Sequence, residues 1–200
     1  IYDNDILLSH KVPSLLSSKM NNQLGFSFVD HFADIKMVSF NYAKNLKDIG
    51  CFSLGFVSAD YGNFNLTNET GQQDLNFTAS DQIVNFGFGR KINQKLNLGF
   101  NINFLNSSYE RYQSTSITSN ISTTYHNSEN NFNSTLLIKN IGRYLKGYTS
   151  NSEKIPYEIQ LGISKKLEHL PFRYSFVFNN LNKFDISNDY SLNSFTNSQT

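Results

Sequence analysis

The stretch Leu96-Asn97-Leu98-Gly99-Phe100-Asn101-Ile102-Asn103-Phe104 decides the fold that we expect for this chain. Every even position holds a large apolar residue, and every odd position holds Asn or Gly. Successive side chains of a β-strand point to opposite faces, so the stretch predicts a strand with one apolar face and one polar face. The polar face carries only amide or small residues. This is typical of a strand whose outer side meets lipid and whose inner side meets a crowded, hydrated lumen.

The composition of the 200-residue chain is compatible with a single all-β domain. Its 18 Phe and 11 Tyr residues favour strands over helices. A formal net charge of +1 gives no indication of a nucleic-acid partner. The only cysteine, Cys51, excludes an intramolecular disulfide and a zinc cluster built from cysteines. No run approaches the ~18 consecutive apolar residues of a membrane helix, but the strands of a β-barrel escape that test.

Alternating apolar residues recur along most of the chain and predict about nine antiparallel strands. Residues 1–22 lack this alternation, and we interpret them as a leader of short helical or irregular pieces, followed by a transmembrane β-barrel over 23–200. The expected strands lie at 24–28, 38–42, 52–56, 84–88, 96–104, 117–125, 132–139, 159–163 and 172–179.

The predicted connections alternate in length from the third strand onward. Those at 62–80, 105–116 and 140–157 are long, whereas those at 92–95, 126–131 and 167–171 are short. Outer-membrane barrels show this asymmetry, with tight periplasmic turns and long external loops, and a Greek-key sandwich does not require it. Single-chain bacterial barrels close with an even number of strands. We therefore expect the chain to be a fragment of the full barrel, with residues missing at its C-terminus and a few at its N-terminus.

No motif predicts catalysis or metal binding. The four histidines are far apart and lack the i, i+4 spacing of a helical zinc site, so we interpret them as surface residues: His10, His31, His126 and His169. Neither a Gly-x-Ser-x-Gly nor a Ser-x-x-Lys motif occurs. The carboxylates of Glu69, Asp74, Asp81 and Glu110 could in principle supply a glycosidase acid and base, but nothing in the sequence fixes their separation. We expect a non-enzymatic protein without a metal or cofactor.

Two short segments near the predicted external loops concentrate aromatic residues and one arginine. They contribute Tyr61, Asn63 and Phe64, and Tyr109, Arg111 and Tyr112. Tyr and Arg are enriched in interface hot spots, so these six residues are our candidates for docking a protein partner. Their alternative role, as a cap or aromatic girdle of the barrel, stays open. The residues that we expect to face lipid are Leu96, Leu98, Phe100, Ile102, Phe104, Phe172, Tyr174, Phe176 and Phe178.

Nine segments, in order along residues 20–180, carry a resemblance to a known family. They are residues 20–24, 32–35, 60–64, 77–81, 109–112, 125–127, 138–142, 156–162 and 171–174. Taken together they resemble the PorQ family of the type IX secretion system of Bacteroidetes, which is related to PorV and more distantly to the FadL-like transporters. The family has an Asn-Pro-Ala/Ser-Leu-Leu step before its first strand. This chain has Val12-Pro13-Ser14-Leu15-Leu16 instead, so it lacks the Asn that would hold the leader inside the barrel.

The resemblance implies a FadL-like outer-membrane barrel with an N-terminal segment that enters the lumen. It further implies a non-enzymatic anchor of the cell-surface attachment complex, in which the protein tethers a PorZ-like surface protein alongside PorU-like sortase and PorV-like components. One alternative is a FadL-like passive transporter of hydrophobic compounds, which would need an apolar pocket. Another is a soluble surface β-sandwich or adhesin, which would stay in solution without detergent.

Overall fold

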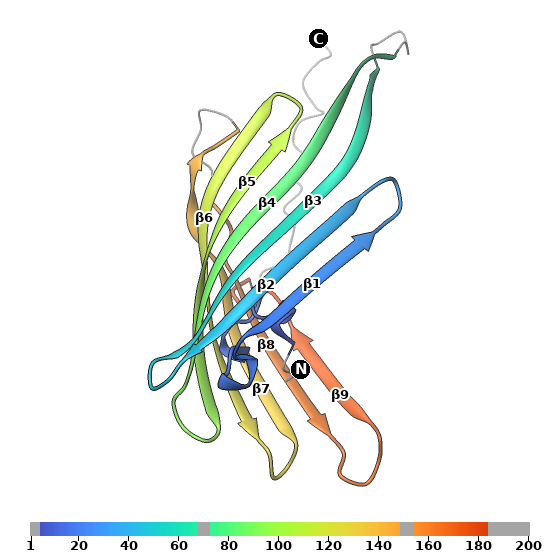
Figure 1. Cartoon of the computed structure of the whole chain (residues 1–200). Helices are drawn as coiled ribbons and strands as arrows, with labels where there is room; N and C mark the ends of the chain where they lie inside the picture. The colour runs from blue at the N-terminus through green and yellow to red at the C-terminus, as the bar shows by residue number, and fades with distance from the viewer. Residues whose placement is uncertain (1–4, 68–72, 149–153, 184–200) are drawn as a thin grey trace, which may run out of the picture.

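The computed structural model describes residues 5–67, 73–148 and 154–183, and these form one curved antiparallel sheet (Figure 1). The predicted number of nine strands is confirmed, and each strand pairs with its neighbours in sequence. The sheet is not closed within the described residues, because β1 and β9 are its two edges. The strands are β1 (Gln23–Asp30), β2 (Lys36–Leu46), β3 (Gly50–Thr67), β4 (Gln73–Lys91), β5 (Leu96–Tyr109), β6 (Tyr112–Asn127), β7 (Phe132–Lys146), β8 (Glu158–Lys166) and β9 (Arg173–Phe178).

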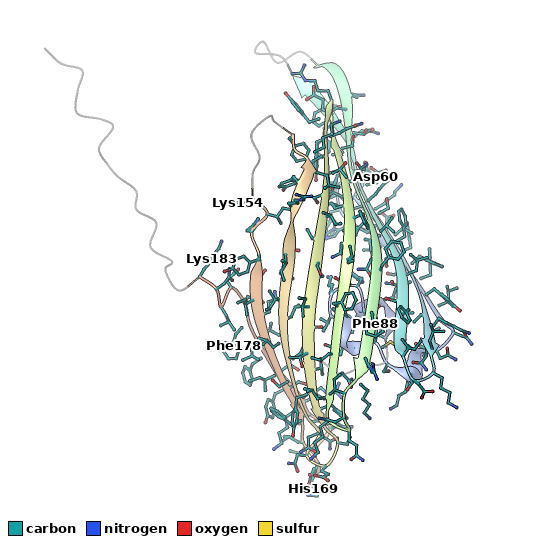
Figure 2. The ribbon with its side chains drawn as sticks, turned by 90° about the vertical axis from the view of Figure 1, so that its left-hand side faces the viewer. Asp60, Phe88, Lys154, His169, Phe178 and Lys183 are labelled. Carbon is teal, nitrogen blue, oxygen red and sulfur yellow. The ribbon has the colours of Figure 1, made fainter. Side chains whose placement is uncertain are left out.

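Apolar and polar residues alternate along the strands, so one face of the sheet is apolar and the other is polar. On β5 the side chains of Leu98, Phe100, Ile102 and Phe104 are 37–46% exposed, whereas Asn97 and Asn101 are at most 5% exposed. The buried residues lie on the concave face, which the N-terminal segment covers. The exposed residues lie on the convex face, as Phe88 of β4 does in Figure 2. The arrangement is the reverse of a soluble protein, in which large apolar side chains are buried and amides are exposed.

The N-terminal segment, residues 5–22, packs against the concave face as three single turns of 3-10 helix (Figure 1). These are η1 (Ile6–Leu8), η2 (Pro13–Leu15) and η3 (Ser18–Met20). Ile6, Leu16 and Met20 form a small buried apolar cluster with Ala43 and Cys51 of the sheet. No helix in the described part of the chain is long and apolar enough to cross a bilayer.

Hydrogen bonds hold this segment against the sheet. The Ser14 amide donates to Ser122 Oγ at 2.8 Å, and the Ser14 hydroxyl lies 2.8 Å from that of Thr124. Asn101 donates its side-chain amide to the His10 carbonyl at 2.6 Å. Ser14 therefore joins the segment to β6, in a position that the sequence did not single out.

The prediction of long loops at 62–80 and 105–116 is wrong. β3 and β4 continue to Thr67 and from Gln73, and β5 and β6 are joined by a tight turn at 110–111. The prediction at 140–157 is wrong in its first part, because β7 extends to Lys146. In residues 105–116 the signal failed because Asn, Ser and Thr occupy both faces, so hydrophobicity no longer alternates. In β3 a β-bulge at Tyr61 and Gly62 interrupts the two-residue period. Residues 1–4 and 184–200 of the predicted leader and barrel lie outside the described residues.

The two ends of the sheet differ. The short connections at 47–49, 92–95, 128–131 and 167–172 lie together at one end, which we call the turn end; His169 marks it in Figure 2. The strand extensions and the connections at 31–35 and 110–111 lie at the other end, which we call the distal end, where β3 and β4 reach furthest (Figure 1).

Candidate functional site

The exposed apolar residues form a continuous belt across the convex face. In register, Phe26 of β1 pairs with Phe40, Phe40 with Phe56, Phe56 with Val84, and Val84 with Phe104. Within β5 the belt runs over the nine residues 96–104, which is about the span of a tilted transmembrane strand. Leu96 itself is half-buried, and the other four predicted residues of this strand are exposed.

The belt ends sharply toward the distal end. One complete cross-strand row on the same face is polar from β1 to β6, and it consists of Asp30, Lys36, Asp60, Ser80, Ser108 and Gln113. Asp60 is labelled in this upper part of the sheet in Figure 2. The polar row therefore marks where the exposed apolar surface of the convex face ends.

In the edge strand β9, side chains on the two faces do not differ in exposure. The predicted residues Phe172, Tyr174, Phe176 and Phe178 are all exposed, and Phe172 lies just before the strand. Every residue of β9 is exposed, however, because no further strand or leader residue packs against this edge in the described structure. Exposure there does not separate an outer face from an inner one.

Beyond the polar row, strands β3 to β6 continue as a protrusion that we call the distal extension (residues 59–67, 73–81 and 107–116). A β-bulge interrupts β3 here. Asp60 pairs with Ser80 and Asn63 with Thr78, so Tyr61 and Gly62 together oppose Ala79. Gly62 adopts a φ of 79°, a conformation that glycine accepts most readily. The bulge re-aims the side chains that follow it.

Two tyrosines meet one carboxylate on the concave side of the distal extension. Tyr61 donates its hydroxyl to Asp81 Oδ2 at 2.7 Å, and Tyr109 donates to Oδ2 and Oδ1 of the same residue at 3.0 and 3.2 Å. Asp81 shares its face with Ala79, Asn85 and Gly87 by the two-residue period of the strand. Ala79 is only 3% exposed, and its small side chain leaves room for the rings on either side.

Aromatic contacts extend this group, which we call the tyrosine–aspartate cluster (Tyr61, Asp81, Tyr109 and Tyr148). The rings of Tyr61 and Tyr109 stack with centroids 6.1 Å apart, and Tyr148 meets Tyr109 edge-on at 5.9 Å. Beside the cluster, Phe64 stacks on Phe77 at 5.1 Å. Five aromatic rings and one carboxylate therefore gather at the distal end.

The cluster keeps its tyrosines protonated. The hydrogen bond to Asp81 is the main cause that raises the pKa of Tyr61 above its usual value, followed by burial. Burial is the main cause for Tyr109, whose pKa is also raised by its hydrogen bond to Asp81. Both hydroxyls therefore remain hydrogen-bond donors to the carboxylate at neutral pH.

The structure brings together some of the predicted docking residues and separates others. Tyr61 and Tyr109 belong to the cluster, and Phe64 lies beside it. Arg111 and Tyr112 form a pair of their own at the turn, with the guanidinium 5.4 Å from the ring centroid and 4.0 Å from the Glu110 carboxylate. Asn63 is exposed and pairs with Thr78.

The sequence does not predict Asp81 and Tyr148 as members of a docking site. It offers Asp81 as a possible member of a glycosidase pair. Counting alternate residues from Asn85 to Asp81 would have placed it on the same face as the buried amides. Nothing in the sequence brings Tyr148, which follows β7, next to Tyr109 of β5.

A cavity of about 550 Å³ lies at the turn end, between the N-terminal segment and the ends of β2 to β4. Its charged lining residues are Lys19, Lys47, Asp48, Arg90 and Lys91. The charged part of the lining is mainly basic, and Leu16, Leu46 and Ile49 add apolar surface. Within the described residues, no group of three His, Cys, Asp or Glu side chains is placed to hold a metal ion.

No protein-family model matches the chain, and a search of curated proteins finds no significant match.

Proposed function

We propose that this chain forms part of an outer-membrane β-barrel that acts as a non-enzymatic anchor, of the kind that the PorQ resemblance implies. The barrel would tether a PorZ-like surface protein in a type IX attachment complex that also contains PorU-like and PorV-like components. One observation carries the proposal: an exposed apolar belt on the convex face is bounded by a polar row that runs unbroken across six strands.

A bilayer explains this belt better than a second protein layer does. In a β-sandwich the apolar face of each sheet is buried against the other sheet, and the polar face is solvated. Here the face with large apolar residues is the open one, and the face with Asn41, Asn85 and Asn101 is covered. Exposed apolar surface that continues over several strands marks an interaction with a membrane or partner.

The distal extension favours a protein partner on the far side of the belt from the turns. It rises beyond the polar row and presents Tyr61, Phe64, Tyr109 and Tyr112, residues of the types that dominate interface hot spots. The concave face offers less support for passive transport of hydrophobic compounds. It is lined by amides and hydroxyls, and its turn end opens into a basic cavity.

The test uses cells that express the protein together with its surface partner. We expect the protein to stay in the outer-membrane fraction after carbonate extraction, and the triple variant Tyr61→Ala/Phe64→Ala/Tyr112→Ala to release the partner. The matched control Ile92→Ala/Leu170→Ala removes two exposed apolar side chains at the turn end and should retain it. Recovery of the protein in the soluble fraction would refute the membrane assignment. Retention of the partner by the triple variant would refute the docking surface.

A further inference from the structure

We propose that the tyrosine–aspartate cluster is a receptor for one cationic side chain, Lys or Arg, which the docking partner inserts into the concave side of the distal end. The inference deepens the proposed function and rests on it for the identity of the partner. The geometry that carries it is a carboxylate without a cationic partner, surrounded by aromatic rings.

The charge of Asp81 is not compensated by a cation within the described residues. The ion pairs found there join Lys95 to Glu129, Arg111 to Glu110, and Lys139 to Glu158, and none of them includes Asp81. Within the described residues, Asp81 accepts from two hydroxyl groups in three contacts, two on Oδ2 and one on Oδ1. A carboxylate offers about four lone-pair positions, so about one, on Oδ1, remains for a ligand. A charged donor forms the stronger bond to such a group.

The rings around Asp81 also favour a cation. A Lys ammonium or Arg guanidinium is attracted to the face of a tyrosine ring within about 6 Å of its centroid. Tyr61 and Tyr109 are half-buried, and Tyr148 is 39% exposed, so a ligand can reach the cluster from outside. Each tyrosine oxygen retains lone pairs that can accept a further hydrogen bond.

One further acid lies close to the cluster. Asp34 lies beside the bulge, where a Cβ on Gly62 would be 3.2 Å from its own Cβ. Side chains of both charges occur at this end of the described β1 to β7. The acids are Asp30, Asp34, Asp60, Asp81 and Glu110, and the bases are Lys36, Arg111, Arg143 and Lys146. Arg111 already contacts Glu110 and the ring of Tyr112. A cation is therefore favoured by the Asp81 carboxylate and the rings around it, and not by the net charge of this end.

A sugar is the competing ligand, because sugars also stack on tyrosine rings. A neutral sugar would leave the charge of Asp81 uncompensated, whereas a Lys or Arg side chain neutralises it. The charge therefore decides between the two, and a neutral analogue of arginine separates them by experiment.

The test titrates the full chain in detergent micelles with N-acetyl-arginine amide and, as a neutral isostere, N-acetyl-citrulline amide. Binding is followed by NMR of ring-labelled tyrosine. We expect saturable shifts with the arginine compound alone, and binding weakened about 10- to 100-fold by Asp81→Asn. Asp60→Asn, which removes an acidic group on the opposite face, should leave binding nearly unchanged. Equal binding of the two compounds, or unchanged binding in Asp81→Asn, would overturn the proposal.

The titration contains no partner protein, so its outcome is independent of the docking assay. Arginine binding together with partner retention in the triple variant would show that the cluster binds a cation but that the partner does not use it, which refutes both the docking surface and the receptor role. Partner release by the triple variant, combined with no effect of Asp81→Asn in either assay, would refute the receptor and leave the proposed function standing.

Discussion

Gly99→Ala should detach the N-terminal segment from the sheet without unfolding the sheet itself. A Cβ at position 99 would fall on the Pro13 carbonyl and the Ser14 amide nitrogen. These are backbone atoms, which cannot rotate away as a side chain can, so the segment must move. The matched control is Gly162→Ala in β8, where the nearest atom, the Thr135 carbonyl oxygen, is 3.9 Å from the added Cβ.

The expected magnitude follows from the hydrogen bonds that the movement breaks. The Ser14 amide, the Ser14 hydroxyl and the His10 carbonyl each hold one bond to the sheet. At about 0.5–1.5 kcal/mol for each of the three bonds, their loss lowers the free energy of opening the segment by about 1.5–4.5 kcal/mol. The equilibrium constant for opening therefore increases roughly 10- to 1,600-fold.

Two assays report this opening. Hydrogen exchange of the Ser14 amide should accelerate by that factor in Gly99→Ala, and amides in the centre of β5 should retain their protection. Trypsin should cleave faster after Lys11 and Lys19, which are both exposed and flank the attached residues. If Gly99→Ala and Gly162→Ala show the same exchange at Ser14 and the same cleavage pattern, then the close contact at Gly99 does not hold the segment.

Three further substitutions test the belt, the cluster and the concave face. Phe100→Arg should destabilise the protein in lipid vesicles by ~2–4 kcal/mol in urea titrations, and Asn106→Arg beyond the belt by ~0–1 kcal/mol; equal effects would contradict the belt. Asp81→Asn should lower the raised pKa of Tyr61, seen as phenolate absorbance at a lower pH. In the wild type, this tyrosine's contribution to stability is present below its ordinary pKa of about 10 and is lost as the pH rises above that value. Asn101→Ala removes the acceptor of the Asn120 amide and should cost ~1–3 kcal/mol, against little change for the exposed Asn106→Ala in the same denaturation assay.

The strands inside the belt could be predicted from the sequence because their two faces differ most in polarity. In residues 96–104 every second side chain is large and apolar, and the structure confirms that the two sets lie on opposite faces. The alternation follows from the two-residue period of a strand and needs no knowledge of the other strands.

The distal extension could not be predicted in the same way. In the part that β5 and β6 contribute, Ser, Thr and Asn lie on both faces, so a strand and a loop have the same hydrophobic pattern. The bulge at Tyr61 and Gly62 also breaks the two-residue period, and it was needed to place Tyr61 and Phe64. Contacts such as Tyr148 with Tyr109 depend on the pairing of β5, β6 and β7, which a single sequence does not specify.

The two faces of the sheet also differ in what they demand of their residues. On the convex face, Phe, Leu, Ile and Val alternate freely in the belt, because any large apolar side chain satisfies a lipid-like surrounding. On the concave face several positions have a particular neighbour. Gly99 lies under the Pro13 backbone, and Asn101 bonds both the Asn120 amide and the His10 carbonyl. The contacts of the polar face therefore specify one strand register and one position of the N-terminal segment. The apolar face requires only that its surroundings be apolar.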